Sequence, residues 1–253
     1  MIDIVIVSYN RPDLLDALID SIRLNTHLPY QIFIVDNAST DITVYPTLAY
    51  HACNPDITVV RNAMNIGYSA AVHEGVGRGC RPYLMILNND TQVTAHWDVT
   101  TMNHMANNED CGALGYMLMD DKGISKGCGV GFNNRLHGWN KPASYVENRY
   151  NKPRIVKYVG GSALFTTRET WNTVGGFNRE YFFYCEDLQY CLDVYSKAGK
   201  NVYYIPHKII HHHEGSLDTS PDAKRANRNT QCTKSLAILK KYYPDEPGLA
   251  EIL

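Results

Sequence analysis

Three short stretches of the chain carry side chains suited to catalysis or metal binding. Asp90 ends an Asn-Asn-Asp stretch that directly follows the apolar run at 84–87, and Glu186 and Asp187 are adjacent carboxylates after an aromatic run. Three consecutive histidines occupy 211–213. A buried strand needs no cluster of amides and carboxylates at its end to be stable, so the first stretch raises the question of a site.

Asp90 has the chemistry of a ligand for a hard divalent cation. Mg²⁺ or Mn²⁺ bound to a diphosphate takes only one or two protein carboxylates, and phosphate oxygens and water complete its shell. A carboxylate at the end of a strand that faces a nucleotide fits this requirement. The alternative is a capping turn in which Asp90 or Thr91 begins a helix. The stretch alone leaves both interpretations open.

Glu186 and Asp187 lie at the predicted start of a helix. The helix N-terminus favours negative charge there, which is a structural explanation for both residues. It also keeps a carboxylate ionised and placed to accept a proton, as a general base must. Neighbouring residues point about 100° apart on a helix, so the two cannot share a role. We expect one to face a cleft and the other to brace a loop.

The histidine run admits metal binding, because neutral imidazole binds Mn²⁺ as well as softer metals. In an extended strand, His211 and His213 would face one way and His212 the other. A solvated run without function is the alternative for each single histidine.

Two further stretches favour ligand contact. Gly160 and Gly161 allow the backbone to approach a ligand closely, although a β-bulge is an equivalent structural explanation. Between residues 135 and 157, six lysines and arginines oppose one acid, with aromatic residues interleaved. Basic residues with stacking rings suit a polyanion or a sugar, and a solvated loop is the alternative. The candidate contacts in this stretch are Trp139, Arg149, Lys152 and Arg154.

The first ninety residues alternate between predicted strands and helices. Apolar β-rich runs at 2–7, 31–35, 56–60 and 83–87 are separated by helical patterns, of which the second spans about 41–52 and the third is opened by Asn65. This alternation predicts a parallel sheet with helices on both faces. In such sheets ligands bind outside the carboxyl ends of the strands. Three polar clusters fall at that rim and favour a nucleotide-sized site: Ser8-Tyr9-Asn10, Asp36-Asn37 and Asn88-Asn89-Asp90.

The pattern changes beyond residue 110. We expect short strands, an irregular stretch at 135–158, two short strands at 201–206 and 208–213, and an amphipathic helix at about 222–243. We predict one continuous α/β domain, in which 1–110 binds the nucleotide, 111–220 holds the acceptor and catalytic residues, and 221–253 forms a helical tail.

Composition excludes several classes of function. The formal net charge is −2, so no global field favours nucleic acid or an anionic membrane. No stretch approaches the 18 apolar residues of a membrane span. The seven cysteines form no Cys-x-x-Cys pair, which indicates reduced thiols and a cytoplasmic protein and makes a structural zinc site unlikely. The oligomeric state is not indicated.

Seven motifs occur in the order typical of one enzyme family: VIVSYNRPDLL, VDNASTD, NIGYSAA, LNNDT, GGSALF, VGGFNREYFFYCEDLQYCL and HHHEGS. The chain therefore resembles family-two glycosyltransferases of the GT-A fold, and most strongly their rhamnosyltransferase-like branch, over residues 2–216. Single motifs are weak indications, but seven in order are strong. The resemblance implies a GT-A type mixed sheet flanked by helices and an inverting transfer from a nucleoside-diphosphate sugar.

The resemblance also implies roles for particular residues. Asp90 should hold Mn²⁺ or Mg²⁺ with a histidine, for which His212 is favoured over His211 and His213. Asp187, beside Glu186, should deprotonate the acceptor hydroxyl, and Phe182 and Phe183 should wall the acceptor side. Asp36 should bind the nucleobase. The other expected contacts to the nucleotide sugar are Ser8, Tyr9, Asn10, Arg11, Asn37, Asn65, Gly67, Asn88, Asn89, Gly161 and Ser162.

The sequence departs from the family pattern in three places. His73 stands where the family helix often carries asparagine, and Gln189 replaces the second aspartate that usually follows the Glu-Asp pair. The usual Phe-Asp-Glu before the aromatic run is replaced by a stretch with Asn178 and Arg179. These departures affect the expected details of donor and acceptor binding.

Other functions are weighed against this one. A glycan is the expected acceptor, and a hydroxymethylated base in DNA is an alternative because of the basic stretch. A nucleotidyltransferase would carry a glycine-rich phosphate loop after the first strand, and residues 8–13 contain no glycine. A non-catalytic nucleotide-sugar binding protein would not need Asp187. Adjacent carboxylates on one helix cannot straddle a glycosidic bond, which argues against a glycosidase.

Overall fold

The computed structural model describes residues 1–212 and 221–246, and for 221–228 it describes the backbone alone. The strands are β1 Ile2–Ser8, β2 Tyr30–Asp36, β3 Ile57–Arg61, β4 Tyr83–Asn88, β5 Thr91–Val93, β6 Cys111–Met119, β7 Ser125–Gly127, β8 Arg154–Ile155, β9 Ala163–Thr167 and β10 Asn201–His211. The helices are α1 Pro12–Asn25, α2 Val44–Ala52, α3 Tyr68–Val76, α4 Trp97–Asn107, α5 Ala143–Arg149, α6 Arg168–Val174, α7 Glu186–Ala198 and α8 Pro221–Tyr242.

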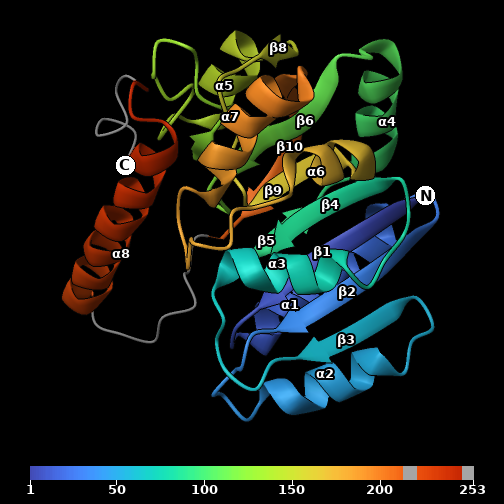
Figure 1. Cartoon of the computed structure of the whole chain (residues 1–253). Coiled ribbons are helices and arrows are strands. Elements are labelled where there is room, and N and C mark those ends of the chain that lie inside the picture. Colours follow the sequence, from blue (N-terminus) through green and yellow to red (C-terminus); the bar gives the residue numbers. More distant parts are fainter. Residues whose placement is uncertain (213–220, 247–253) are drawn as a thin grey trace.

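The described strands form one mixed sheet that runs through both halves of the chain (Figure 1). Its order is β3-β2-β1-β4-β9-β6-β10-β5, and β7 and β8 pair with β6 and β10. β1 pairs in parallel with β2 and β4, and β2 with β3. The predicted parallel arrangement of the first ninety residues is therefore confirmed. β9 lies antiparallel between β4 and β6, which makes the sheet mixed, as the GT-A resemblance implied.

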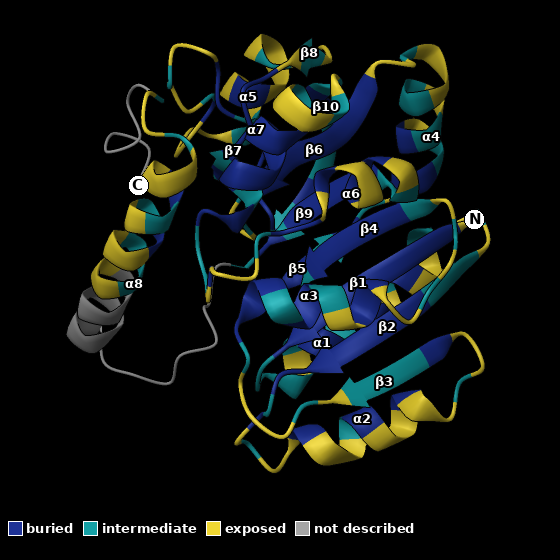
Figure 2. Ribbon diagram, in the orientation of Figure 1, coloured by how far each residue is buried: buried dark blue, intermediate teal, exposed yellow. Residues whose placement is uncertain are grey.

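Helices cover both faces of the sheet because its central strands are apolar on both sides. In β1, Ile4 and Ile6 contribute to the core that includes α1, α2 and α4, whereas Val5 and Val7 contribute to the core that includes α3, α6 and α7. Figure 2 shows the central strands buried and the helices exposed on their outer faces. The sequence of a parallel strand that is covered on both faces is a nearly continuous apolar run, which is the pattern of β1.

The second half is more regular than the sequence predicts. The two short strands expected at 201–206 and 208–213 are one strand, β10, which continues through His211. Its register against β6 shifts between Tyr204 and Lys208, where Pro206 cannot donate to the ladder. Because of that proline, the sequence pattern of this single strand resembles that of two short strands. The stretch at 135–158 is likewise not irregular throughout, since it contains α5 and β8.

Two helices begin differently from the predictions. α3 begins at Tyr68 after Gly67, and Asn65 lies before the helix, where its Oδ1 accepts a bond from the Gly67 N–H. α2 begins at Val44 and not near residue 41, because the Asp41 carboxylate accepts bonds from the backbone and hydroxyl of Thr43 and forms a turn before the helix.

The C-terminal half of α8 is anchored to the α6–α7 segment. Ser235 is buried and donates a hydrogen bond to the Phe183 carbonyl at 2.7 Å. Leu239 is fully buried in the core that includes α7. The Tyr243 hydroxyl donates to Asp193 on α7. The predicted C-terminal helix is therefore confirmed, and it is fixed to the segment that precedes Glu186.

All seven cysteines are free thiols, in agreement with the absence of Cys-x-x-Cys pairs. Within residues 1–212 and 221–246, no helix has the length and apolar character needed to cross a membrane.

Gly67 is required by a close approach between distant segments. Its φ is +85°, and a Cβ there would lie 2.8 Å from the Phe182 carbonyl oxygen. We predict that Gly67→Ala lowers the free energy of unfolding by about 3 kcal/mol through strain and clash. Gly199→Ala is the matched control, because Gly199 also has positive φ but has open space around it; it should cost about 1 kcal/mol. Equal losses in chemical denaturation would show that the Phe182 contact does not matter.

Candidate active site

The polar clusters predicted for the sheet rim do lie together. Ser8 at the end of β1 pairs with Asp36 at the end of β2, and Val7 pairs with Asn88 at the end of β4. Asp36 also pairs with Arg61 at the end of β3. Four parallel strands therefore end at one edge, and each delivers a polar residue to it. The physical reason is the common direction of the strands, which the sequence pattern already indicated.

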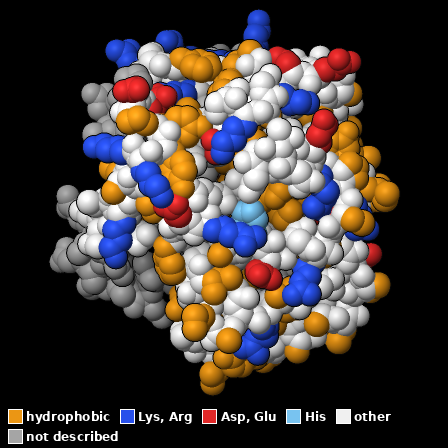
Figure 3. Space-filling view, viewed as in Figure 1, with side chains coloured by type: hydrophobic (Ala, Val, Ile, Leu, Met, Phe, Trp, Pro, Cys, Tyr) orange, Lys and Arg blue, Asp and Glu red, His pale blue; other side chains and the backbone are white. Residues whose placement is uncertain are grey.

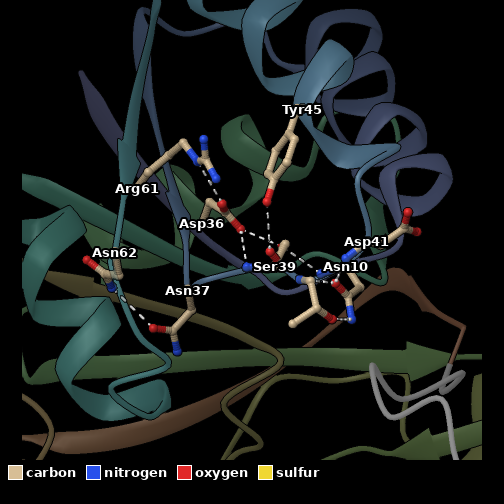
Figure 4. Close-up of polar contacts among 9 residues, drawn as sticks. Asn10, Asp36, Asn37, Ser39, Asp41, Tyr45, Arg61 and Asn62 are labelled. Atoms are coloured by element: carbon tan, nitrogen blue, oxygen red, sulfur yellow. Dashed lines mark hydrogen bonds and ion pairs between the residues drawn. The ribbon is translucent and has the colours of Figure 1, made fainter.

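Asp36 lies at the centre of a buried polar cluster (Figure 4). Its Oδ1 accepts a bond from the Ser39 N–H at 3.1 Å, and its Oδ2 accepts one from Arg61 Nε at 3.1 Å. The Arg61 guanidinium also lies over the Tyr45 ring, 4.3 Å from its centroid. Arg61 and Tyr45 are both exposed on their outer sides, so a planar ligand at Asp36 would meet them.

Sequence reasoning missed Arg61 and Tyr45. Arg61 directly follows the predicted strand 56–60, so the rule that polar residues gather at strand ends could have identified it. Tyr45 carries no such signal, because its contact with Arg61 depends on how α2 packs beside β3.

Asn10 shapes the loop after β2. Its Oδ1 accepts bonds from the N–H groups of Thr40 and Asp41, both at 2.9 Å, and its own N–H donates to Ser39 Oγ (Figure 4). Asn10 and Arg11 both have positive φ, and Arg11 pairs with Asp13. The hydrogen bonds of Asn10 account for its own left-handed conformation. Of the other residues predicted here, Tyr9 is half-buried and Ser8 is fully buried.

Asn37 shapes the loop before α3. Its Nδ2 donates to Asn65 Oδ1 at 2.9 Å, and its Oδ1 accepts from Asn62 Nδ2 and the Ile66 N–H, both at 3.1 Å. Its Nδ2 also reaches the Gly67 carbonyl. Asn37 and Asn65 therefore hold the backbone of this loop, and the structure brings both to the predicted rim.

Asp90 and His211 form the part of the site suited to a metal. His211 Nε2 lies 3.3 Å from Asp90 Oδ1, and the His212 N–H donates to the Asp90 carbonyl at 2.9 Å. Thr91 pairs with His211 across the β5–β10 ladder. Because Asp90 directly precedes Thr91, this pairing brings His211 beside Asp90. The sequence ranked His212 first, but the imidazole beside Asp90 is that of His211. His213 lies outside the described residues.

The donor set at Asp90 fits a divalent cation. One carboxylate and one imidazole face each other, and both side chains are largely buried. In the described part of the chain, no cluster of three or more His, Cys, Asp or Glu side chains is arranged to hold a metal. A cation here would therefore need ligands from a bound substrate, as Mn²⁺ or Mg²⁺ on a diphosphate does.

The other predicted residues of the Asn-Asn-Asp stretch bind neighbouring loops. Asn89 is buried and its Nδ2 lies 3.3 Å from the Asn10 carbonyl and 3.5 Å from Ser8 Oγ. The Asn88 N–H donates to the Ser162 carbonyl. The stretch thus joins the ends of β1 and β4 to the segment at 160–162.

Asp187 is held at the start of α7 by two backbone donors. Its Oδ2 accepts a bond from the Gly161 N–H at 2.7 Å, and its Oδ1 accepts one from the Leu188 N–H at 2.8 Å. Burial raises the pKa of Asp187, while these N–H groups oppose the rise. The side chain is nevertheless partly exposed. A carboxylate with a raised pKa that still reaches the surface can accept a proton.

Glu186 is the more deeply buried of the two acids. It is 4% exposed, and within the described residues its Oε2 has no hydrogen-bond partner. Burial, and after it the adjacent charge of Asp187, raises the pKa of Glu186 well above its usual range. The geometry differs from the expected division of roles: Asp187 both braces the Gly161 loop and stays accessible, whereas Glu186 faces the interior.

Tyr68 lies among the acids and ties them to both halves of the chain. Its hydroxyl donates to the Gly161 carbonyl at 3.1 Å. Burial, followed by the charges of Glu186, Asp187 and Asp90, raises the pKa of Tyr68 well above its usual value. Asn88, two residues before Asp90, donates to the Ser162 carbonyl, and the adjacent Gly161 bonds both Tyr68 and Asp187, so a short bonded path links the predicted metal ligand to the predicted base.

Of the predicted acceptor contacts, the two phenylalanines lie near this place. Phe182 is 47% exposed and its carbonyl accepts a bond from the Tyr68 N–H. Phe183 is half-buried, and its ring lies 5.8 Å from that of Tyr68.

The basic stretch is not one exposed strip. Arg154 lies over the Tyr150 ring and pairs with Tyr204 in the β8–β10 ladder. Tyr204 precedes His211 by seven residues, which is about 20 Å along the strand. Lys157 is buried in an ion pair with Glu246. Trp139, Arg149 and Lys152 are exposed, and acceptor binding by these residues stays a prediction.

The fold is that of GT-A glycosyltransferases. The structure is similar to that of GalNAc-T7 with UDP, GalNAc and Mn²⁺ (TM-score 0.68, 17% identity, 92% of this chain and 48% of that chain). It is also similar to the mannosyltransferase PcManGT from Pyrobaculum calidifontis in complex with GDP-Man and Mn²⁺ (TM-score 0.66, 16% identity, 99% and 68%). The chain thus spans about half of the first structure, and these similarities show the fold.

Sequence comparison shows the family. The model of glycosyl transferase family 2 matches residues 3–168, more than half of the chain, which therefore belongs to that family. A curated relative is the N-acetylglucosaminyl-diphospho-decaprenol L-rhamnosyltransferase of Mycobacterium tuberculosis, 25% identical over 87% of this chain and 79% of the relative. The chain is a rhamnosyltransferase-like enzyme of this family, which removes the nucleotidyltransferase and non-catalytic alternatives.

The buried acid Glu186 should make stability depend on pH. Because its pKa is raised in the folded state, its contribution is fully present below the usual glutamate pKa and is lost as pH rises through the folded value. Each unit of the rise corresponds to about 1.4 kcal/mol. We predict that Glu186→Gln gains unfolding free energy over wild type as pH increases from 4 to about 8, measured by denaturation. Glu74→Gln, at an exposed position, is the control; a parallel pH profile for Glu186→Gln would contradict the assignment.

Proposed function

We propose that this enzyme is an inverting, metal-dependent glycosyltransferase that moves a sugar from a nucleoside-diphosphate sugar to a hydroxyl of a glycan. The observation that carries the proposal is that the Asp90–His211 pair and Asp187 are linked through residues 161 and 162: Asn88, two residues before Asp90, donates to the Ser162 carbonyl, and Gly161 donates to Asp187. A metal-binding pair at one side and an accessible base at the other are what a single displacement at an anomeric carbon needs. Residues 1–110 would bind the donor and 111–220 the acceptor.

Asp187 acts as the general base. Its Oδ atoms are fixed by Gly161 and Leu188, and its raised pKa favours proton acceptance. The acceptor hydroxyl gives its proton to Asp187 as its oxygen forms a bond to the anomeric carbon. The bond from that carbon to the diphosphate oxygen breaks, and the electron pair leaves with the diphosphate. Attack opposite the leaving group inverts the configuration.

Asp90 and His211 would hold the divalent cation with the donor diphosphate. Such a cation stabilises the negative charge that develops on a leaving diphosphate. The Mn²⁺ in the two similar structures supports a divalent ion. Either Mn²⁺ or Mg²⁺ suits a carboxylate, an imidazole and phosphate oxygens.

The donor base would lie at Asp36. Its carboxylate is oriented by Ser39 and Arg61, and each carboxylate oxygen can accept more than one bond. Arg61 and Tyr45 form an adjacent planar wall on which a base can stack. The titles of the similar structures include UDP and GDP-Man, which supports a nucleoside-diphosphate donor.

A glycan is the preferred acceptor. The mycobacterial relative is named for transfer to a lipid-linked amino sugar, and none of the similar proteins described above is named for action on DNA. The buried ion pair of Lys157 and the stacked Arg154 also weaken the basic stretch as a site for a polyanion.

Replacement of Asp187 by asparagine should separate catalysis from donor binding. We expect Asp187→Asn to reduce transfer at least ~10²-fold, because an amide cannot accept the proton, while binding of nucleoside diphosphate changes little. Turnover with an acceptor glycan and calorimetry with the nucleotide are the measurements. Asp121→Asn, at an exposed turn, serves as control. Near wild-type turnover by Asp187→Asn would eliminate Asp187 as the base.

Replacement of Asp90 should remove the effect of the metal. Wild-type enzyme is expected to bind nucleoside diphosphate more tightly with Mn²⁺ than without it. In Asp90→Ala this strengthening should disappear, because the ion loses its carboxylate ligand. Calorimetry with and without Mn²⁺ tests this, with Asp121→Ala as control. An unchanged metal dependence would mean that Asp90 only caps the turn.

A further inference from the structure

Tyr68 holds two distant segments of the chain, one through its side chain and one through its backbone. Its hydroxyl donates to the Gly161 carbonyl at 3.1 Å, and its N–H donates to the Phe182 carbonyl at 2.6 Å. Gly161 precedes β9 and Phe182 lies in the α6–α7 segment, so each is separated from Tyr68 by 93 residues or more. The first residue of α3 therefore fixes these two segments relative to each other.

The proposed base joins the same two segments. Asp187 follows Phe182 by five residues, and its Oδ2 accepts a bond from the Gly161 N–H at 2.7 Å. The base and its backbone donor thus come from the two segments that Tyr68 holds. Because a hydrogen bond weakens steeply as its geometry departs from the optimum, the alignment of this donor with the carboxylate depends on both contacts of Tyr68.

Backbone N–H groups stabilise the negative charge of Asp187. Within residues 1–212 and 221–246, no lysine or arginine pairs with it, and the bonds from Gly161 and Leu188 are what oppose the rise in its pKa on burial. Figure 3 shows the side of the molecule on which α3, α6 and α7 lie, with lysine and arginine side chains spread over it. A weaker bond from Gly161 would therefore not be replaced by a nearby cation, and the pKa of Asp187 would rise further.

The surroundings of Tyr68 keep its phenol neutral and in place. Burial, and after it the charges of the nearby acids, raises the pKa of Tyr68 well above its usual value, so the hydroxyl keeps its proton and remains a donor. Its ring packs against those of Phe177 and Phe183, at centroid distances of 6.2 and 5.8 Å. These ring contacts do not need the hydroxyl, so its removal tests one hydrogen bond.

The position of Tyr68 depends in turn on the rim that is predicted to bind the nucleotide. The Asn37 side chain, just after β2, donates to Asn65 Oδ1 at 2.9 Å and to the Gly67 carbonyl at 3.3 Å. Tyr68 directly follows Gly67. The residue that holds the segments around the base therefore belongs to the half of the chain proposed to bind the donor.

We propose that Tyr68 is a positioning residue for the base: its hydroxyl and its N–H keep the Gly161 N–H aligned with the Asp187 carboxylate. Tyr68 takes no proton in the reaction and acts only through Asp187. The inference rests on the proposed function, since it presumes that Asp187 is the base. Without the hydroxyl, the Gly161 carbonyl is released, and the N–H of the same residue holds the carboxylate less firmly.

The first test measures Asp187 directly. In the full chain with ¹³C-labelled aspartate, the carboxyl signal of Asp187 is assigned by its absence in Asp187→Asn and is titrated with pH by NMR. Tyr68→Phe should move the midpoint of this titration to higher pH, because a weaker bond from Gly161 stabilises the charged form less.

Tyr204→Phe is the matched control for this titration. Tyr204 is also a buried tyrosine, and its hydroxyl donates to a backbone carbonyl, that of Tyr150, at 2.8 Å. The midpoint for Asp187 should stay at the wild-type value in this variant. An unchanged midpoint in Tyr68→Phe, or an equal shift in both variants, overturns the positioning role.

The second test measures the reaction. A panel of nucleoside-diphosphate sugars that includes UDP-glucose, GDP-mannose and dTDP-rhamnose is hydrolysed with Mn²⁺ present, and water takes the place of the acceptor hydroxyl. Tyr68→Phe should lower kcat ~10-fold, the factor that corresponds to one buried hydrogen bond. The acidic limb of its pH–rate profile should move to higher pH, since a base must be deprotonated to act. Calorimetry should show unchanged binding of the nucleoside diphosphate.

The outcomes separate the positioning role from the proposed function. A fall in kcat with an unmoved acidic limb would make Tyr68 merely structural and overturn the inference. Wild-type kcat and pH profile in Tyr68→Phe, with Asp187→Asn inactive, overturn the inference alone. Wild-type turnover in Asp187→Asn, or no hydrolysis of any donor by the wild-type enzyme, defeats the proposed function, and the NMR titration still decides whether Tyr68 acts on Asp187.

Discussion

The hydrogen bond from the Gly161 N–H to the Asp187 carboxylate is the contact on which the candidate site depends. Gly161 also accepts from Tyr68, whose N–H donates to the Phe182 carbonyl. A short chain of hydrogen bonds thus joins the first residue of α3, the loop before β9 and the start of α7. A Cβ at position 161 would lie 3.0 Å from the Asp187 Cβ, so the close approach needs a glycine. The acid that we propose as base is therefore positioned by the N–H of Gly161, before β9, and by the N–H of Leu188 in its own helix.

The same contact has an electrostatic cost. Asp187 and Glu186 are adjacent acids in a poorly solvated place, and an ionised pair would be repulsive as well as desolvated. Two N–H donors favour the charged form of Asp187, and Glu186 has none on Oε2 within the described residues. In the proposed reaction, Asp187 would therefore carry the negative charge and Glu186 the proton. Sites with this division are common where a base must be active near neutral pH.

Much of the fold could be predicted because it depends on local patterns. The four apolar strands at the start of the chain, their direction and the polar residues at their ends follow from periodicity and from the strand-end rule. Contacts between distant segments could not be predicted. Arg61 meets Tyr45 only because α2 packs beside β3, and His211 rather than His212 meets Asp90 because β10 continues past Pro206 and sets its register against β5. The composition of residues 135–157 likewise could not predict that Lys157 forms a buried ion pair with Glu246.

The placement of the proposed base depends on the α6–α7 segment. Tyr184 and Cys185 adopt left-handed conformations just before α7, and Ser235 of α8 donates a hydrogen bond to the Phe183 carbonyl. Left-handed conformations of residues other than glycine are strained, and they persist only where surrounding contacts impose them. Because Asp187 is the second residue of α7, its position depends on where that helix begins. The strained residues before the helix and the anchor from α8 together fix that point, and so they fix the proposed base.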